Sequence, residues 1–140
     1  MQGSYSVLLQ SGLGPQDSPT SASIAQTGTI PESTLSIQFI ARQVLGGLSP
    51  LLAVSIQGQN VPIVAISSNA NYTVFGADIS SYSGLASEVR IGSYPNGQYG
   101  SFLIDSIQFS NQPIPEPSAI GLVGLGALLF SYRTRLIRRT

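Results

Sequence analysis

The chain contains no histidine, cysteine or lysine among its 140 residues, and this limits the chemistry that its side chains can perform. Nucleophiles activated by a neighbouring histidine or lysine cannot form, and zinc sites built on histidine or cysteine are excluded. The remaining catalytic option is a pair of carboxylates acting on a glycoside. Only five acidic residues precede position 116, and they are widely spaced. No catalytic pair stands out, and we predict that the protein is not an enzyme.

A calcium site needs only oxygen ligands, and Asp78 and Asp105 are the two candidate ligands. Asp105 lies in the run FLIDSIQF, where alternation places it on one face with Leu103, Ile107 and Phe109. Because an unpaired buried carboxylate is costly, this acid should lie at a sheet edge, bond to a loop, or bind a metal. The sequence leaves these three alternatives open, and it indicates no other cofactor.

The segment SYPNGQYGS holds the best candidate ligand-binding residues, Tyr94, Asn96 and Tyr99. Tyrosine rings on a loop can stack on sugar rings, while amide groups bond to sugar hydroxyls. The same pattern is also typical of a hairpin loop with two packing tyrosines. The chain has no tryptophan, which would be the favoured platform for a sugar.

The candidate ligand residues lie in a region that we expect to form β-strands. Most of residues 5–109 alternates between apolar and polar side chains with period two, which is typical of strands. The runs are YSVLLQ, STLSIQFIA, LLAVSIQ, NVPIVAI, NYTVFGA, EVRIG and FLIDSIQF. We expect Leu52–Ile56 and Val61–Ile66 to form a hairpin around Gly58. The run DISSYSGLA is long enough for one helical turn. About eight short strands with Gly, Pro, Asn and Ser between them indicate an antiparallel sandwich or barrel.

The composition agrees with an all-β domain. Charged residues make up 9% of the chain, against roughly 25% in a typical soluble domain. The surface must therefore be covered by Ser, Thr, Asn, Gln and Gly, which favours strands over helices. Residues 1–114 carry five acidic and two basic side chains, a formal charge of −3. Such a body has no basic patch for phosphates, so we expect no nucleic-acid partner.

The C-terminal residues have a different character. Pro115, Glu116 and Pro117 mark a boundary that a helix does not cross, and fifteen uncharged residues, 118–132, follow them. The basic end, residues 133–140, carries Arg133, Arg135, Arg138 and Arg139. We therefore predict a β-domain at 1–112 and a separate tail at 113–140.

A helix over 118–132 would be about 22 Å long, shorter than the ~30 Å hydrocarbon core of a bilayer. The long arginine side chains that follow can extend the span by reaching the interface, and positive charges favour the cytoplasmic side. We therefore expect a short transmembrane helix that anchors the chain, with the β-domain on the opposite side. The alternative is a buried terminal helix of the β-domain, which leaves the four arginines hard to place.

A Pro-Glu-Pro motif, a Gly/Leu-rich apolar run and terminal arginines together resemble the PEP-CTERM sorting domain of Gram-negative bacteria. The resemblance covers 115–139. It implies that Pro115, Glu116 and Pro117 are recognised by an exosortase, a membrane transpeptidase-like processing enzyme. It also implies export to the cell surface or to an extracellular polysaccharide matrix.

Members of that family carry an N-terminal signal peptide, whereas the start MQGSYSVLLQSG has no basic residue and only three consecutive apolar ones. We expect either a misassigned start codon or a fragment, and either could also remove a first strand.

The segments NYTVFGADISSYSGLASEVRIGS and GSFLIDSIQFS resemble the last strands of jelly-roll, galactose-binding-like domains. We therefore predict a jelly-roll-like sandwich in a non-enzymatic cell-surface or matrix protein. The alternative is a carbohydrate-binding module, assisted by calcium, that attaches to exopolysaccharide.

Overall fold

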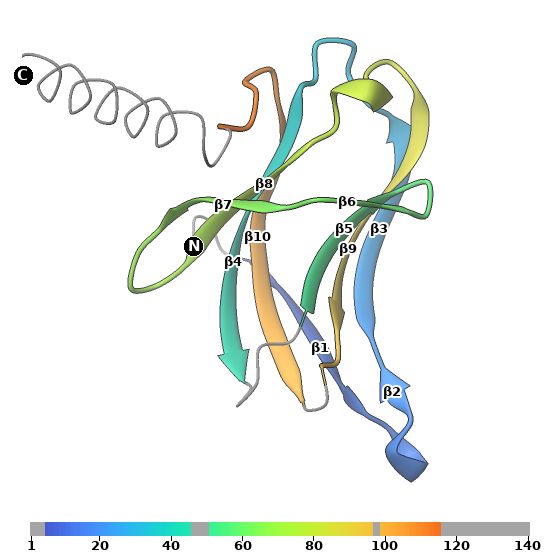
Figure 1. Ribbon diagram of the computed structural model, residues 1–140, viewed down its shortest axis with the longest axis vertical. Helices are drawn as coiled ribbons and strands as arrows, with labels where there is room; N and C mark the ends of the chain where they lie inside the picture. Colours follow the sequence, from blue (N-terminus) through green and yellow to red (C-terminus); the bar gives the residue numbers. More distant parts are fainter. Residues whose placement is uncertain (1–4, 46–50, 97–98, 116–140) are drawn as a thin grey trace, which may run out of the picture.

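The computed structural model describes residues 5–45, 51–96 and 99–115, and this part of the chain forms two antiparallel sheets packed face to face (Figure 1). The six-stranded sheet has the order β2-β1-β10-β4-β8-β7, and the four-stranded sheet has the order β3-β9-β5-β6. The strands are β1 (Val7–Leu13), β2 (Pro19–Thr20), β3 (Ala22–Thr29), β4 (Ser36–Leu45), β5 (Leu51–Ile56), β6 (Gln59–Val61), β7 (Val64–Ser68), β8 (Thr73–Asp78), β9 (Ala86–Tyr94) and β10 (Gly100–Ser110). The 3-10 turns are η1 (Pro15–Asp17) and η2 (Ser80–Tyr82). The predicted all-β sandwich is confirmed.

Strands from the first half of the domain pair with strands from the second half in a nested order. β1 pairs with β10, β3 with β9, β4 with β8, and β5 with β6, all antiparallel. Successive pairs in this series belong alternately to the six-stranded and the four-stranded sheet. The pairings of β10 with β4 and of β9 with β5 then join the pairs within each sheet. The β5–β6 hairpin is thus the innermost pair, and the strands after it pair with those before it in reverse order.

The β5–β6 hairpin confirms the expected pairing and corrects the second strand. Ile56 pairs with Gln59 across a two-residue loop, Gln57-Gly58, whose φ angles are 50° and 77°. Two positive φ values suit the right-handed twist of a hairpin, and glycine adopts one of them without strain. Pro62 has no N–H for a ladder, and the predicted Val61–Ile66 strand divides there. Figure 1 shows β6 and β7 as one nearly continuous line that crosses between the sheets.

The core lies between the two sheets and is mostly aliphatic. Phe39 of β4 and Phe75 of β8 are directly paired, and their rings stack with centroids 5.9 Å apart. The side chains of Phe39, Ile37, Val54, Ile56 and Ile104 are almost completely buried. At one end the core is polar, because Ser11 and Ser93 meet between the sheets with their Oγ atoms 2.9 Å apart.

A bulge in β10 overturns the expected position of Asp105. The register with β4 shifts between Asp105 and Gln108, and Ser106 has a φ of 52°. The extra residue reverses the alternation, as bulges do. Asp105 therefore pairs beside Ile40 on the outer face of the sheet, whereas Ile107 and Phe109 line the space between the sheets. Asp105 pairs with β4 on one side, whereas the pairing of β10 with β1 ends one residue earlier, at Ile104. The sheet-edge alternative for Asp105 therefore stays open.

Two phenylalanines test this placement of the core. Phe39 is 1% exposed and Phe109 is 43% exposed. We expect Phe39→Ala to lower the free energy of unfolding by about 3–5 kcal/mol, because it removes a stacked ring and leaves a cavity. Phe109→Ala, the matched control, should cost less than about half of this. Urea denaturation followed by circular dichroism measures both variants, and equal losses would contradict the described core.

Candidate functional site

The carboxylate of Asp78 caps the turn that follows β8. Its Oδ1 accepts a hydrogen bond of 2.9 Å from the backbone N–H of Ser80, at the start of η2. This bond, together with a side-chain bond from Ser80, lowers the pKa of Asp78 from its ordinary value of 3.8, although burial slightly opposes the change. The charged form is thus stabilised by the chain itself.

The carboxylate of Asp105 serves the bulge in β10. Its Oδ1 accepts a hydrogen bond of 2.7 Å from the N–H of Ser106, the residue with positive φ. A bulge leaves one residue outside the regular ladder, so this bond satisfies a backbone donor that the bulge displaces. The donor belongs to the neighbouring residue of β10 itself and not to a loop, so the predicted bond to a loop stays a prediction.

The structure does not bring the two predicted calcium ligands together. Asp105 pairs with Ile40 of β4, whereas Asp78 pairs with Ser36 of the same strand. Four residues along β4 and two strand spacings separate them, which corresponds to about 16 Å between their Cα atoms. Within residues 5–45, 51–96 and 99–115, no three acidic side chains cluster as a metal site would require. Asp78 and Asp105 therefore cannot bind the same calcium ion, and each stays a predicted ligand of a separate site.

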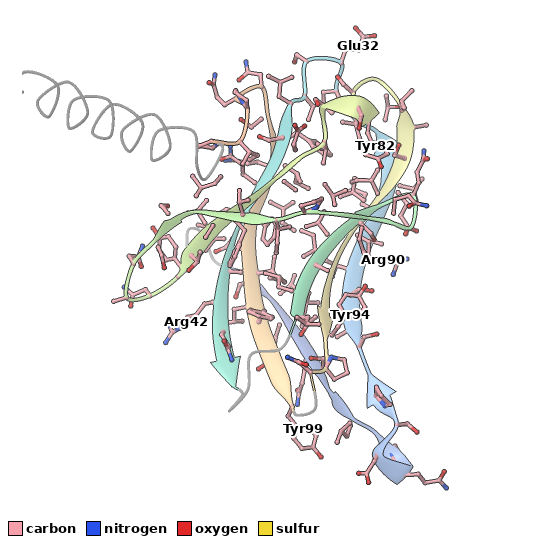
Figure 2. The ribbon with its side chains drawn as sticks, viewed as in Figure 1. Glu32, Arg42, Tyr82, Arg90, Tyr94 and Tyr99 are labelled. Atoms are coloured by element: carbon pink, nitrogen blue, oxygen red, sulfur yellow. The ribbon has the colours of Figure 1, made fainter. Side chains whose placement is uncertain are left out.

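The two predicted ligand-binding tyrosines lie on opposite outer faces of the sandwich. The ring of Tyr94 folds back over Gly92 of β9, with Tyr94 Oη 2.9 Å from the place that a Cβ on residue 92 would occupy. The ring of Tyr99 covers Gly12 of β1 in the same way. Gly92 adjoins the inward-facing Ser93 and Gly12 adjoins the inward-facing Ser11, so both glycines face outward. Figure 2 shows the two labelled tyrosines apart, Tyr94 at the end of β9 and Tyr99 just before β10.

Tyr94 and Tyr99 therefore do not form one clamp. Tyr99 is 62% exposed and presents a ring to solvent, while Tyr94 is half-buried. Asn96 is exposed in the loop between β9 and β10. Any ligand would meet these residues on separate surfaces.

An ion pair lies on the same outer face of β9 as Tyr94, four residues earlier in the strand. Arg90 donates to Glu88 Oε1 at 2.8 Å and to Ser23 Oγ at 2.9 Å, which ties β9 to β3. The two charged side chains are 39% and 38% exposed. An ion pair this exposed contributes little stability, so its effect is to orient the guanidinium on the outer face of the sheet.

A cleft with a volume of about 360 Å³ lies between the sheets. Ile24 and Ile91 line it from the four-stranded sheet, and Ile107 and Phe109 line it from β10. The pairing of β1 with β10 ends at Val7 and Ile104, and the cleft lies beside the following part of β10. Its lining is largely apolar and includes no acidic or basic residue, which suits an apolar side chain better than a sugar.

After β10 the chain turns back onto the outer face of the six-stranded sheet. Ser36 Oγ donates to the carbonyl oxygen of Gln112 at 2.8 Å, and the N–H of Gln112 donates to Ser110 Oγ at 3.1 Å. The Cδ1 atom of Ile114 occupies the space that a Cβ on Gly76 would need. The described chain therefore remains attached to the sheet until one residue before Pro115.

The remaining predicted site residues lie outside the described residues. These are Glu116, Pro117, the predicted helix 118–132 and the four terminal arginines. Within the part of the chain that the structure describes, no helix is long and apolar enough to cross a membrane.

The comparisons with known proteins concern this same end of the chain. Residues 113–139 match the family model of the PEP-CTERM protein-sorting motif. The resemblance of the tail is thereby confirmed. Such a signal implies export to the cell envelope or surface of a Gram-negative bacterium and sorting by exosortase, a membrane enzyme. No curated protein and no solved structure matched the chain.

Sequence reasoning missed the contact between Gly76 and Ile114. One signal was present, because a glycine inside the alternating run NYTVFGA indicates a close approach to the backbone. The partner could not be inferred, since Ile114 lies 38 positions further along the chain, beyond a turn of unknown geometry.

The bonds to Asp78 predict a specific pH dependence. Because the folded-state pKa is lowered, the stabilisation is fully present above pH 3.8 and disappears as the pH falls through the folded-state value. We expect Asp78→Asn to be less stable than the natural protein at neutral pH, and the difference to vanish in acid. Denaturant midpoints measured between neutral pH and pH ~2.5 test this. A difference that persists unchanged in acid would show that the charge of Asp78 is not responsible.

Proposed function

We propose that this is a non-enzymatic cell-surface or matrix protein, whose β-sandwich is displayed outside the cell after delivery by its C-terminal signal. The observation that carries the proposal is the sorting-motif match over 113–139, which begins three residues after β10 ends at Ser110. The sandwich and the signal are thus directly joined, and the part that is displayed is the sandwich itself.

The types of residue in the tail support a signal that is read at the membrane surface. Two prolines around Glu116 lack N–H groups, so this segment resists joining the sheet or a helix. Glu116 supplies a charge that a recognising enzyme can read and that resists entry into the bilayer. The terminal arginines oppose outward sliding of the predicted helix, because each costs about 2.5–3.5 kcal/mol at the bilayer centre.

We further propose that the sandwich is a jelly roll, related to galactose-binding-like domains. The nested pairing supports this, because a jelly roll is a long antiparallel hairpin rolled so that successive strand pairs alternate between two sheets. Eight strands, β1, β3, β4, β5, β6, β8, β9 and β10, follow this order, and β2 and β7 extend the six-stranded sheet at its two edges.

The lack of catalytic groups supports a display function. With no histidine, cysteine or lysine in the sequence, the common nucleophile pairs are impossible. Three of the described carboxylates have structural partners: Asp78 bonds to a turn, Asp105 to a bulge and Glu88 to an arginine.

The motif itself can be tested in a Gram-negative host that carries exosortase, with export supplied by an added signal peptide. We expect replacement of Pro115, Glu116 and Pro117 by alanine to leave the protein in the membrane fraction with its tail attached. The exposed Pro31-Glu32 pair, in a turn before β4, offers a matched control, and its replacement by alanine should leave processing unchanged. Immunoblotting of membrane and surface fractions measures both.

Replacement of the four terminal arginines by serine should fail differently, by loosening membrane retention before processing. If the Pro-Glu-Pro variant is processed and released at the normal rate, the tail is only an anchor and the sorting function is wrong.

A second candidate function is carbohydrate binding, which would attach the domain to exopolysaccharide. The exposed ring of Tyr99, held flat over Gly12, favours it, because a ring fixed on a sheet presents one face for stacking on a sugar. The guanidinium of Arg90, on the same face of β9 as Tyr94, offers donors for sugar hydroxyls on the opposite side of the sandwich.

Separate surfaces predict separate effects. If the domain binds sugar, we expect Tyr99→Ala to abolish glycan-array binding while Tyr94→Ala leaves at least part of it, or the reverse. Calcium should not alter the affinity, since Asp78 and Asp105 do not converge. Absence of binding to any glycan would leave display as the function of the domain, and equal loss in both variants would contradict two independent surfaces.

A further inference from the structure

On the outer face of the six-stranded sheet, the side chain of Ile114 packs over Gly76. Gly76 of β8 pairs with Gln38 of β4 and faces outward, because its neighbours Phe75 and Ala77 pair with the inward-facing Phe39 and Ile37. Gly76 is nevertheless buried, which means that other atoms cover it. The covering atoms are the Cδ1 atoms of Ile114 and Ile66, the latter 2.8 Å from the place of a Cβ.

A polar contact fixes the same segment one strand away. Ser36 is 0% exposed although it lies on the outer face, and its hydroxyl bonds the carbonyl oxygen of Gln112 at 2.8 Å. A buried hydroxyl without a partner would be costly, so Ser36 and the Gln112 carbonyl satisfy each other. Gly76 leaves room for the side chain of Ile114, and Ser36 bonds the backbone of Gln112. Together they form a binding surface, here called the seat, for residues 112–114.

We propose that this face is a docking surface for the leading edge of the chain's own sorting signal, and that docking withholds the N-terminal flank of the Pro-Glu-Pro motif from exosortase. The second half of the proposal rests on the proposed function. Ile114 directly precedes Pro115, and Glu116 lies at most about 7 Å of extended chain from Ile114. Binding of an extended peptide uses main-chain hydrogen bonds and pockets for alternate side chains. On this proposal the enzyme binds the residue before the motif in this way, so Ile114 must first leave Gly76.

Docking then lowers the apparent affinity of the enzyme for its signal by the fraction of molecules that are undocked. The contact is small, one side chain and one hydrogen bond, so the docked and undocked states exchange readily. The signal is therefore restrained by the folded domain but not blocked.

Gly76→Ala tests the seat without altering any residue of the signal. The added methyl group would collide with the far ends of Ile114 and Ile66, which are flexible, and Gly76 does not have a positive φ. The variant should therefore displace Ile114 and keep the fold. Gly28→Ala in β3 is the matched control, because nothing lies within 4 Å of its Cβ position and its φ is not positive. Ser36→Ala removes the hydrogen bond to Gln112 and provides a second test if Gly76→Ala is unstable.

The first measurement uses the full chain in detergent, with its isoleucine δ1 methyl groups labelled. We expect a nuclear Overhauser effect between the Ile114 methyl and the Gly76 α-protons in the natural protein and in Gly28→Ala. In Gly76→Ala and Ser36→Ala the Ile114 methyl should shift towards its solvent-exposed position. Absence of the effect in the natural protein, or no change in either variant, would overturn docking.

The second measurement is the rate of processing in the exosortase-bearing host. We expect Gly76→Ala to be processed about threefold to tenfold faster than the natural protein, and Gly28→Ala at the natural rate. Equal rates in all three, with docking confirmed by the first measurement, would overturn the withholding. If none of the three is processed, the exosortase function fails while docking stands, so the two failures are distinguishable.

Discussion

The pairing of β10 between β1 and β4 is the constraint on which the rest of the structure depends. β10 begins at Gly100, yet it fills the space between strands that begin at Val7 and Ser36. The six-stranded sheet cannot close until this last strand is in place, and the sorting signal follows it within a few residues. Because such long-range pairing carries a large loop-closure cost, folding of the sheet waits for the end of the chain. Completion of the sheet thus also forms the surface on which residues 112–114 lie.

The residues that flank β10 hold it at both ends by the same device. Tyr99, just before β10, lies on Gly12 of β1, and Ile114, just after it, lies on Gly76 of β8. In each case a strand glycine leaves bare backbone that a large side chain covers, which replaces the contacts that a Cβ would make. Two large side chains thus cover backbone on an outer face that carries few charged residues. The same two contacts place one tyrosine at the surface and one isoleucine beside the sorting motif.

The sequence predicted the sandwich well and the site poorly, for physical reasons. Period-two alternation located β4, β5, β8 and β9, because apolar side chains recur at every second position and face the core. It missed β3, where Ile24 is the only large apolar residue and most positions are exposed at a sheet edge. It also misplaced Asp105, since alternation carries no mark of the bulge at Ser106. Tyr94 and Tyr99, five residues apart in the chain, looked like one loop, but the chain passes from one sheet to the other between them.

The central claim, delivery of an intact sandwich by a removable C-terminal signal, is tested most directly by intact-mass spectrometry of the protein recovered from the cell surface. The host should be examined in two forms, with exosortase and with its exosortase deleted. The account predicts a surface form that keeps β10 and loses mass from within residues 113–140 only when the enzyme is present. A surface form of the same full mass in both strains would contradict it.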